Sequence, residues 1–267
     1  MNNRVLFLNQ EIMPYLPESE MAKAGLEIPK GIQERGFEVR TFMPKYGCIN
    51  ERRNQLHEVI RLSGMNLIID DTDHPLIIKV ATLQPARMQV YFIYNEDYFQ
   101  RAPDKGLETD LSPETNDERC IFFARGAIET VKKLRWEAGI VHCQGWMSAL
   151  APLYIKKNYA DDPAFCDAKI VYSLFGSSIE ETLDGRFKEK LRMEGFSDKD
   201  LKLLSDGKPT DFNTLAKLAL TYSDGVIIHT KTVSQELLDF IETKKIPCIP
   251  YHEGSDVDRY AEFYKSL

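Results

Sequence analysis

Three aspartates and a histidine stand within five consecutive positions, at Asp70, Asp71, Asp73 and His74. Carboxylate oxygens this close together could hold Mg²⁺ or Ca²⁺, because hard cations prefer oxygen ligands. The alternative is a solvated hairpin turn, since aspartate hydrogen-bonds nearby backbone and is favoured in turns. The pattern favours the turn, so we predict neither a metal site nor a cofactor.

The remaining polar residues that could do chemistry follow apolar runs typical of strands. They lie in segments 9–20, 145–148, 175–178 and 230–233. Ligands of open α/β sheets bind at the carboxyl ends of strands. The chain contains no Gly-x-Gly-x-x-Gly and no Gly-x-x-x-x-Gly-Lys-Ser/Thr sequence, which argues against a dinucleotide or P-loop site. No serine or histidine near these ends stands in a recognisable nucleophile setting, so no catalytic residue is predicted.

Alternating apolar runs and amphipathic stretches must position these strand ends. Strands are predicted at 5–8, 37–43, 139–142, 168–174 and 225–229. Helices are predicted at 19–35, 117–137, 146–157, 211–222 and 233–242. This order predicts about five parallel strands with crossover helices. The expected fold class is α/β, with a single Rossmann-like, doubly wound domain over residues 1–267.

Two segments depart from this alternation. Residues 57–95 hold short strand-like runs with few helical signals between them, and predict a small antiparallel β insertion. Residues 102–118 combine Pro103, Gly106 and Pro113 with closely spaced acids, and predict a mobile, exposed acidic loop.

Charge and hydropathy exclude several classes of partner. The 267 residues carry 34 lysines and arginines against 41 aspartates and glutamates, a net charge of −7 with no basic stripe. This argues against nucleic acid and against membrane surfaces as partners. No apolar run approaches the roughly 18 residues of a spanning helix, so the expected location is the cytoplasm. The five scattered cysteines form no Cys-x-x-Cys pair and are expected to be free thiols.

Short motifs follow one another in a characteristic order along nearly the whole chain. They are 5–8 with Glu11 and Pro14, 29–36, 43–47, 90–93 with Asn95, 119–128, 140–146, 149–154 and 212–217. Each is weak alone, but the ordered series resembles bacterial glycogen and starch synthases that use ADP-glucose. The resemblance implies the N-terminal half of a two-lobed glycosyltransferase. Its family activity would be glucosyl transfer from ADP-glucose to the nonreducing end of an α-1,4-glucan.

Several positions depart from the family pattern. Pro17, Glu18, Ser19 and Glu20 stand where the family carries Lys-Thr-Gly-Gly. At the family's His-Asp-Trp-His stretch the chain has 144–147, Gln-Gly-Trp-Met, and at its Thr-(Ile/Val)-His-Asn turn it has 172–175, Tyr-Ser-Leu-Phe. The chain also ends at Leu267, where the lobe that holds most of the nucleotide-sugar would begin. These departures predict the loss of the cationic cradle that a departing diphosphate needs.

The resemblance nevertheless indicates candidate substrate-binding positions. They are Glu11, Tyr15, Asn95, His142, Gln144 and Trp146. Trp146 could stack on a sugar face or serve as a core tryptophan. Glu11 could bind a sugar hydroxyl or the backbone of a neighbouring loop. For His142, the loss of the surrounding polar groups favours a core histidine over a ligand-binding one.

The predicted function is therefore a glycogen or starch synthase-like lobe that is catalytically degenerate alone. It would retain at most the binding of α-glucan or another carbohydrate. Two alternatives stay open. One is a non-enzymatic interaction or regulatory protein, which would use a protein partner or self-association through the face that the second lobe would cover. The other is an active transferase completed by another chain.

Overall fold

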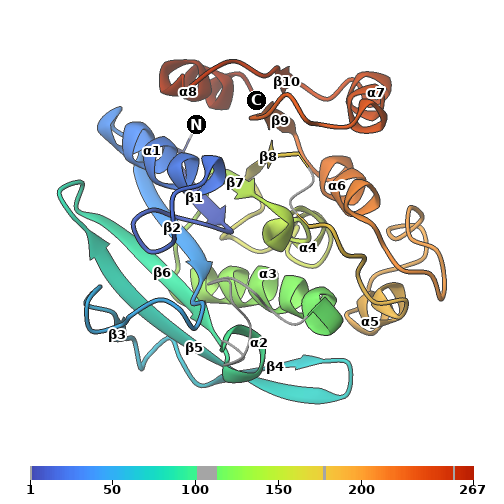
Figure 1. Ribbon diagram of the computed structural model, residues 1–267, viewed down its shortest axis with the longest axis horizontal. Helices are drawn as coiled ribbons and strands as arrows, with labels where there is room; N and C mark the ends of the chain where they lie inside the picture. The colour runs from blue at the N-terminus through green and yellow to red at the C-terminus, as the bar shows by residue number, and fades with distance from the viewer. Residues whose placement is uncertain (1, 101–112, 177–178, 255) are drawn as a thin grey trace.

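The computed structural model describes residues 2–100, 113–176, 179–254 and 256–267 (Figure 1). Its central sheet has the order β10-β9-β8-β7-β1-β2-β6-β5-β3, with β4 paired to β5. From β10 to β6 all neighbours are parallel. These strands are β1 (Arg4–Asn9), β2 (Glu38–Pro44), β6 (Met88–Tyr94), β7 (Ile140–Gln144), β8 (Lys169–Leu174), β9 (Gly225–Ile228) and β10 (Cys248–Ile249). The predicted doubly wound α/β sheet is confirmed.

The expected β insertion corresponds to an antiparallel extension of this sheet. It comprises β3 (His57–Glu58), β4 (Met65–Ile69) and β5 (Thr72–Leu83), and β5 also pairs antiparallel with β6. Because β6 is at the same time parallel to β2, it joins the extension to the central sheet. The first strand of the extension, β3, has only two residues.

Helices cover both faces of the sheet (Figure 1). The helices are α1 (Glu20–Glu34), α2 (Glu96–Phe99), α3 (Asn116–Lys133), α4 (Ala151–Lys157), α5 (Phe187–Met193), α6 (Phe212–Thr221), α7 (Gln235–Lys244) and α8 (Val257–Ser266). The apolar sides of α1 and α8 pack with Val5, Phe7 and Ile140 in one cluster. The larger cluster on the other face contains the buried residues of α3, α4 and α6.

Two sequence expectations need correction. The helix expected over 146–157 is a 3₁₀ turn, Trp146–Ser148, followed by α4, because Pro152 lies in the first turn of a new helix and has no N–H to continue an earlier one. Of the acidic loop expected at 102–118, residues 102–112 lie outside the described residues. Residues 113–118 are helical: Pro113–Thr115 form a 3₁₀ turn and α3 starts at Asn116.

The aspartate cluster forms a hairpin turn, as the composition favoured. Asp70 and Asp71 connect β4 to β5, where Ile69 pairs with Thr72. The Asp70 carboxylate accepts two hydrogen bonds from Arg186, at 2.8 and 2.9 Å, and the pKa of Asp70 is lowered by this partner. His74 instead lies inward, with Nε2 2.8 Å from the Tyr98 hydroxyl. Among the helices within the described residues, none is long and apolar enough to cross a membrane.

Candidate functional site

A cavity of about 340 Å³ lies at the carboxyl ends of β1, β8 and β9 and beside the start of α1. We call it the sheet-edge cavity. Its lining residues are Gln10, Glu11, Ser19, Glu20, Met21, Phe175, Gly176, Thr230 and Thr232. Three of the four strand-end segments selected from the sequence therefore meet here. The fourth lies directly beneath, because the Met147 backbone N–H donates to Gln10 Oε1 at 3.3 Å.

The first loop is organised by a serine that caps α1. The Ser19 hydroxyl accepts a hydrogen bond from the Ala22 N–H at 2.9 Å and donates one to Glu11 Oε2 at 2.6 Å. Such a cap satisfies one of the free N–H groups at a helix start. The positive end of the helix dipole favours anions, and here Glu11 and Glu20 already supply the negative charge. The loop therefore offers no vacant anion site at this helix end.

The lining of the sheet-edge cavity is acidic and rich in hydroxyl groups. Glu11 and Glu20 contribute carboxylates, and Thr230 and Thr232 lie 3.1 Å apart through their hydroxyl oxygens. No lysine or arginine belongs to the described lining. Lys231 lies between the two threonines in sequence, but its ammonium group lies 5.5 Å from the centre of the Tyr251 ring. Neutral hydroxyl-bearing ligands or cations suit this lining, whereas phosphates do not.

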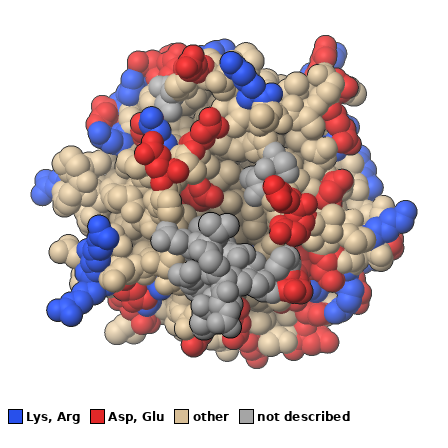
Figure 2. All heavy atoms as spheres, viewed as in Figure 1, with Lys and Arg blue, Asp and Glu red and all other residues tan. Residues whose placement is uncertain are grey.

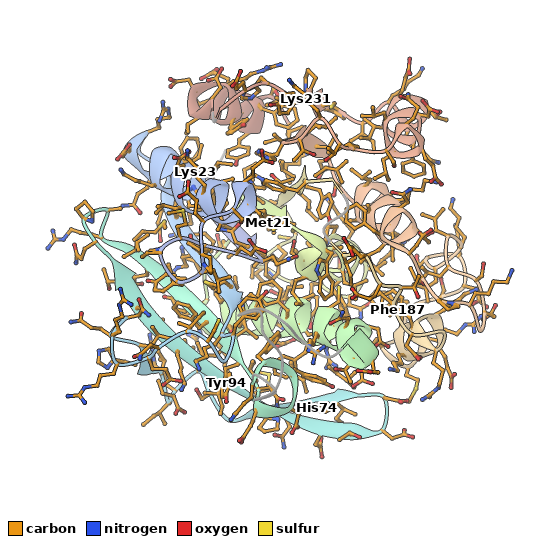
Figure 3. All side chains as sticks on the ribbon, in the orientation of Figure 1. Met21, Lys23, His74, Tyr94, Phe187 and Lys231 are labelled. Carbon is orange, nitrogen blue, oxygen red and sulfur yellow. The ribbon has the colours of Figure 1, made fainter. Side chains whose placement is uncertain are left out.

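The exposed surface agrees with this distribution of charge. Figure 2 shows carboxylates gathered around a central hollow on the face that α1 borders, with most of the lysines and arginines nearer the rim. Figure 3 places Lys23 on α1 and Lys231 on the segment that follows β9. Lys23 lines a second cavity of about 280 Å³, which shares Glu20 and Phe175 with the sheet-edge cavity. The lysine stands there among three acids, Glu20, Glu27 and Glu253.

A chain of polar side chains runs inward from His229, which lines the second cavity. His142 Nδ1 lies 2.5 Å from the Tyr264 hydroxyl and Nε2 lies 2.5 Å from Ser173 Oγ, which in turn lies 2.8 Å from His229 Nε2. Burial lowers the pKa of both histidines to about 3. Ser173 is 1% exposed, so no substrate atom can reach its hydroxyl. The set therefore stabilises the interior with neutral imidazoles.

Glycine at position 25 allows α1 to lie directly against the loop that carries Glu11. A Cβ at this position would lie 2.1 Å from the Glu11 carbonyl oxygen. In an ordinary helix, Gly→Ala stabilises by up to about 1 kcal/mol. Here the clash is with backbone, and we expect Gly25→Ala to lower the free energy of unfolding by about 2 kcal/mol.

Urea unfolding of Gly25→Ala tests this expectation, with Gly126→Ala in α3 as the control. A Cβ at Gly126 would meet the tips of the Leu76 and Ile93 side chains at 3.0 and 3.1 Å, which can shift. The control should therefore lose less stability. A Gly25→Ala protein as stable as the wild type would show that α1 does not fix the first loop.

Of the six candidate residues from the sequence, one lines a described cavity and five are buried inside the protein. Glu11 lines the sheet-edge cavity. His142 is a core histidine with both ring nitrogens hydrogen-bonded, as its surroundings favoured. Gln144 is buried, and its amide donates to the Met21 carbonyl at 3.2 Å, while Oε1 has no hydrogen-bond partner in the described part of the chain.

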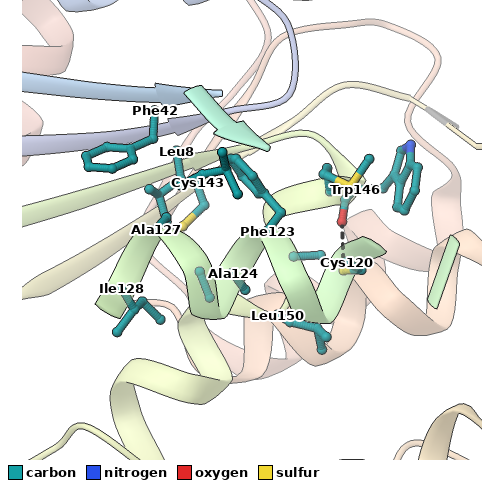
Figure 4. Packing of buried hydrophobic residues seen from close by; sticks show 14 of the residues in the cluster. Leu8, Phe42, Cys120, Phe123, Ala124, Ala127, Ile128, Cys143, Trp146 and Leu150 are labelled. Carbon is teal, nitrogen blue, oxygen red and sulfur yellow. Dashed lines mark hydrogen bonds between the residues drawn. The ribbon is translucent and has the colours of Figure 1, made fainter. Parts of the chain in front are cut away.

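The other three candidates are built into the core. Tyr15 contacts Phe92 edge-on with 4.9 Å between ring centres, and burial raises its pKa to about 12. Asn95 caps α2, since its oxygen accepts from two backbone N–H groups and its nitrogen donates to the Pro75 carbonyl. Trp146 is 6% exposed and its carbonyl accepts from Cys120 Sγ at 3.4 Å (Figure 4). None of the three belongs to the described cavity linings, and their predicted binding roles stay predictions.

Sequence reasoning missed the hydrogen-bonded series that joins His142 to Ser173 and Ser173 to His229. Neither Ser173 nor His229 belongs to a sequence motif. Whether side chains on neighbouring parallel strands can form a hydrogen bond depends on how the strands are aligned, and in this structure Ser173 lies opposite Ile227 of β9. The available signal was that His142, Ser173 and His229 all stand at or just beyond the carboxyl ends of predicted adjacent strands.

Comparison with known proteins agrees with this architecture. A family model described as the starch synthase catalytic domain matches residues 4–246. The chain is 37% identical over 200 residues to a glycogen synthase of Chlorobium limicola, and 36% identical over 197 residues to one of Chlorobium phaeobacteroides. These matches cover 73% and 72% of this chain and 40% of each relative.

A solved structure shows the same fold at lower sequence identity. The catalytic domain of starch synthase IV from Arabidopsis thaliana, bound to ADP and acarbose, superposes with a TM-score of 0.76 at 18% identity. The match covers 96% of this chain and 52% of that chain. The chain thus spans about half of that structure and about two fifths of the curated relatives.

Proposed function

Because the chain belongs to the starch synthase catalytic domain family, we propose that it is an N-terminal lobe of the glycogen synthase type whose sheet-edge cavity binds a neutral α-glucan. The cavity would not bind the diphosphate of ADP-glucose. The proposed setting is the cytoplasm. The observation that carries the proposal is the described lining, which has two carboxylates and several hydroxyl groups but no lysine or arginine.

Sugar hydroxyls are well matched to this lining. A carboxylate accepts hydrogen bonds from two hydroxyl groups, and a threonine hydroxyl can donate or accept. Ser19 holds the Glu11 carboxylate in place through Oε2, and Glu11 Oε1 forms no hydrogen bond with the described residues, so it can accept from a ligand. Phe175 supplies an apolar wall beside these polar groups. Polar groups at fixed positions around an apolar wall are typical of small-ligand sites.

The same charges argue against transfer from ADP-glucose by these residues alone. A departing diphosphate needs positive charge or fixed N–H donors, and each such donor typically contributes about 2.7–4 kcal/mol of transition-state stabilisation. Glu11 and Glu20 present the opposite charge at the first loop, where the helix dipole would otherwise help. Without that stabilisation, we propose that the lobe is catalytically degenerate alone.

The proposal predicts that Glu11→Gln weakens glucan binding about tenfold, which corresponds to losing one hydrogen bond to a charged acceptor. Isothermal titration of the purified protein with maltoheptaose measures the change. Glu34→Gln is the matched control, because Glu34 lies at the other end of α1 with its side chain 62% exposed. Equal unfolding temperatures would show that the variants keep the fold.

Two results would contradict the proposal. The first is the absence of maltoheptaose binding by the wild-type protein, which would favour the alternative of an interaction protein with a protein partner or a second copy of the chain. The second is unchanged affinity in Glu11→Gln, which would place the glucan elsewhere.

A further inference from the structure

A third cavity, of about 300 Å³, lies beside β5, β6 and the end of α3. Its polar lining is basic, with guanidinium groups from Arg40 on β2 and Arg61 on the segment between β3 and β4. No aspartate or glutamate belongs to the described lining. We call it the arginine cavity. Two arginines without an acid in one cavity are unusual in a chain with a net charge of −7.

Arg40 is held in place by aromatic side chains. Its guanidinium carbon lies 5.7 Å from the centre of the Tyr91 ring and 5.4 Å from that of Trp136, and Nη1 donates to the Tyr91 hydroxyl at 2.5 Å. Its Nε is buried and finds no hydrogen-bond partner among the residues that the structure describes. Contacts with ring faces stabilise a cation without neutralising it. Arg40 therefore presents a fixed positive charge.

The positive charge of the cavity is not compensated by nearby acids. Glu38 is close enough to interact electrostatically with Arg40, but its carboxylate already accepts from Arg4 Nε at 2.9 Å and Trp136 Nε1 at 2.6 Å. The Arg61 side chain forms neither an ion pair nor a hydrogen bond within the described parts of the chain. Lys133 also lies nearby and donates to the Leu62 carbonyl.

From this arrangement we propose that the arginine cavity binds a dianionic phosphate group, either free or on a small phosphate ester. Guanidinium groups match phosphate oxygens with paired N–H donors. Gln89 Oε1 accepts from the Tyr91 hydroxyl at 3.1 Å, so the Gln89 amide N–H groups can supply a further donor, and Leu62 and Leu134 form an apolar wall against which the carbon skeleton of an ester can pack. The site is independent of the glucan proposal, because the two cavities share no lining residue.

Titration calorimetry with inorganic phosphate and with glycerol 3-phosphate tests this site. Arg61→Gln changes an exposed side chain, so the fold should persist, and the affinity for both probes should fall about tenfold. Arg40→Lys keeps the charge but loses the planar donor pair, and should weaken both as well. Arg259→Gln on α8 is the control, because Arg259 is exposed on the opposite face of the sheet and should leave both affinities unchanged.

The two probes separate the sources of the phosphate group. Tighter binding of glycerol 3-phosphate supports an ester that uses the apolar wall, and equal or tighter binding of inorganic phosphate supports the free ion. Failure of the wild-type protein to bind either probe would overturn the proposal. So would affinities in Arg61→Gln and Arg40→Lys that equal those of the wild type.

Discussion

Replacing Lys190 by methionine is expected to lower the free energy of unfolding by about 3–5 kcal/mol, because it leaves buried carboxylates without their counter-charge. Lys190 Nζ lies 2.6 Å from Asp117 Oδ2 and 2.7 Å from Glu118 Oε1. The Asp117 side chain is 0% exposed and that of Lys190 is 6% exposed. Burial raises the pKa of Asp117, and the hydrogen bond from Lys190 opposes that shift. Urea unfolding at pH 7 measures the loss.

Lys188→Met on the same helix is the matched control. The Lys188 side chain is also largely buried, but its partners Asp206 and Asp198 are 63% and 70% exposed. These carboxylates stay hydrated when the lysine is lost, so the variant should cost only about 1 kcal/mol or less. Equal losses for the two variants would mean that the burial of Asp117 has no energetic consequence.

Two histidines with lowered pKa values, His142 and His229, predict a loss of stability in acid. Burial lowers the pKa of His142 and His229 to about 3, whereas histidine in an unfolded chain titrates near 6.5. Between these values the unfolded chain binds more protons than the folded one, so stability falls as the pH falls from about 6.5 to about 3. Each histidine should contribute about 2 kcal/mol to the difference in unfolding free energy between pH 7.5 and pH 5.0.

His229→Gln tests this effect. The variant keeps the hydrogen bond between His142 and Ser173, so Ser173 does not lose its last polar partner. The unfolding free energy should fall between pH 7.5 and pH 5.0 in both proteins. The fall should be about 2 kcal/mol smaller in the variant than in the wild type. His57→Gln is the control, since His57 is exposed on β3 and its replacement should leave the difference unchanged. An identical pH dependence in His229→Gln and the wild type would contradict the assignment.

The fold could be predicted because the central strands are uniformly apolar and the helices carry local start signals. The run 5–8 is buried on both faces as β1, and Ser19 caps α1 where the pattern predicted a helix start. The helical turn at residues 113–116 could not be predicted, because Glu114 and the acids that follow it look solvated in sequence. The buried Asp117 in the first turn of α3 pairs with Lys190, which lies 73 positions away in the sequence.

The site was predictable in location but not in composition. Parallel strands end at one edge of the sheet, so the segments after β1, β8 and β9 had to meet. Which side chains face the cavity depends on packing: Glu11 does, whereas Trp146 is buried in the core and Asn95 caps α2. The family resemblance indicated these residues as candidates for substrate binding. The sequence alone could not show that their polar atoms form hydrogen bonds with other parts of the protein.

The central claim is that the sheet-edge cavity binds glucan without the donor's diphosphate. The most direct test is titration of the purified protein with maltoheptaose, first alone and then with ADP-glucose in the cell. We predict the same maltoheptaose affinity in both titrations and no heat from ADP-glucose alone. A maltoheptaose affinity that changes with ADP-glucose would contradict the account and support an active transferase, because coupling requires that both ligands bind and influence each other.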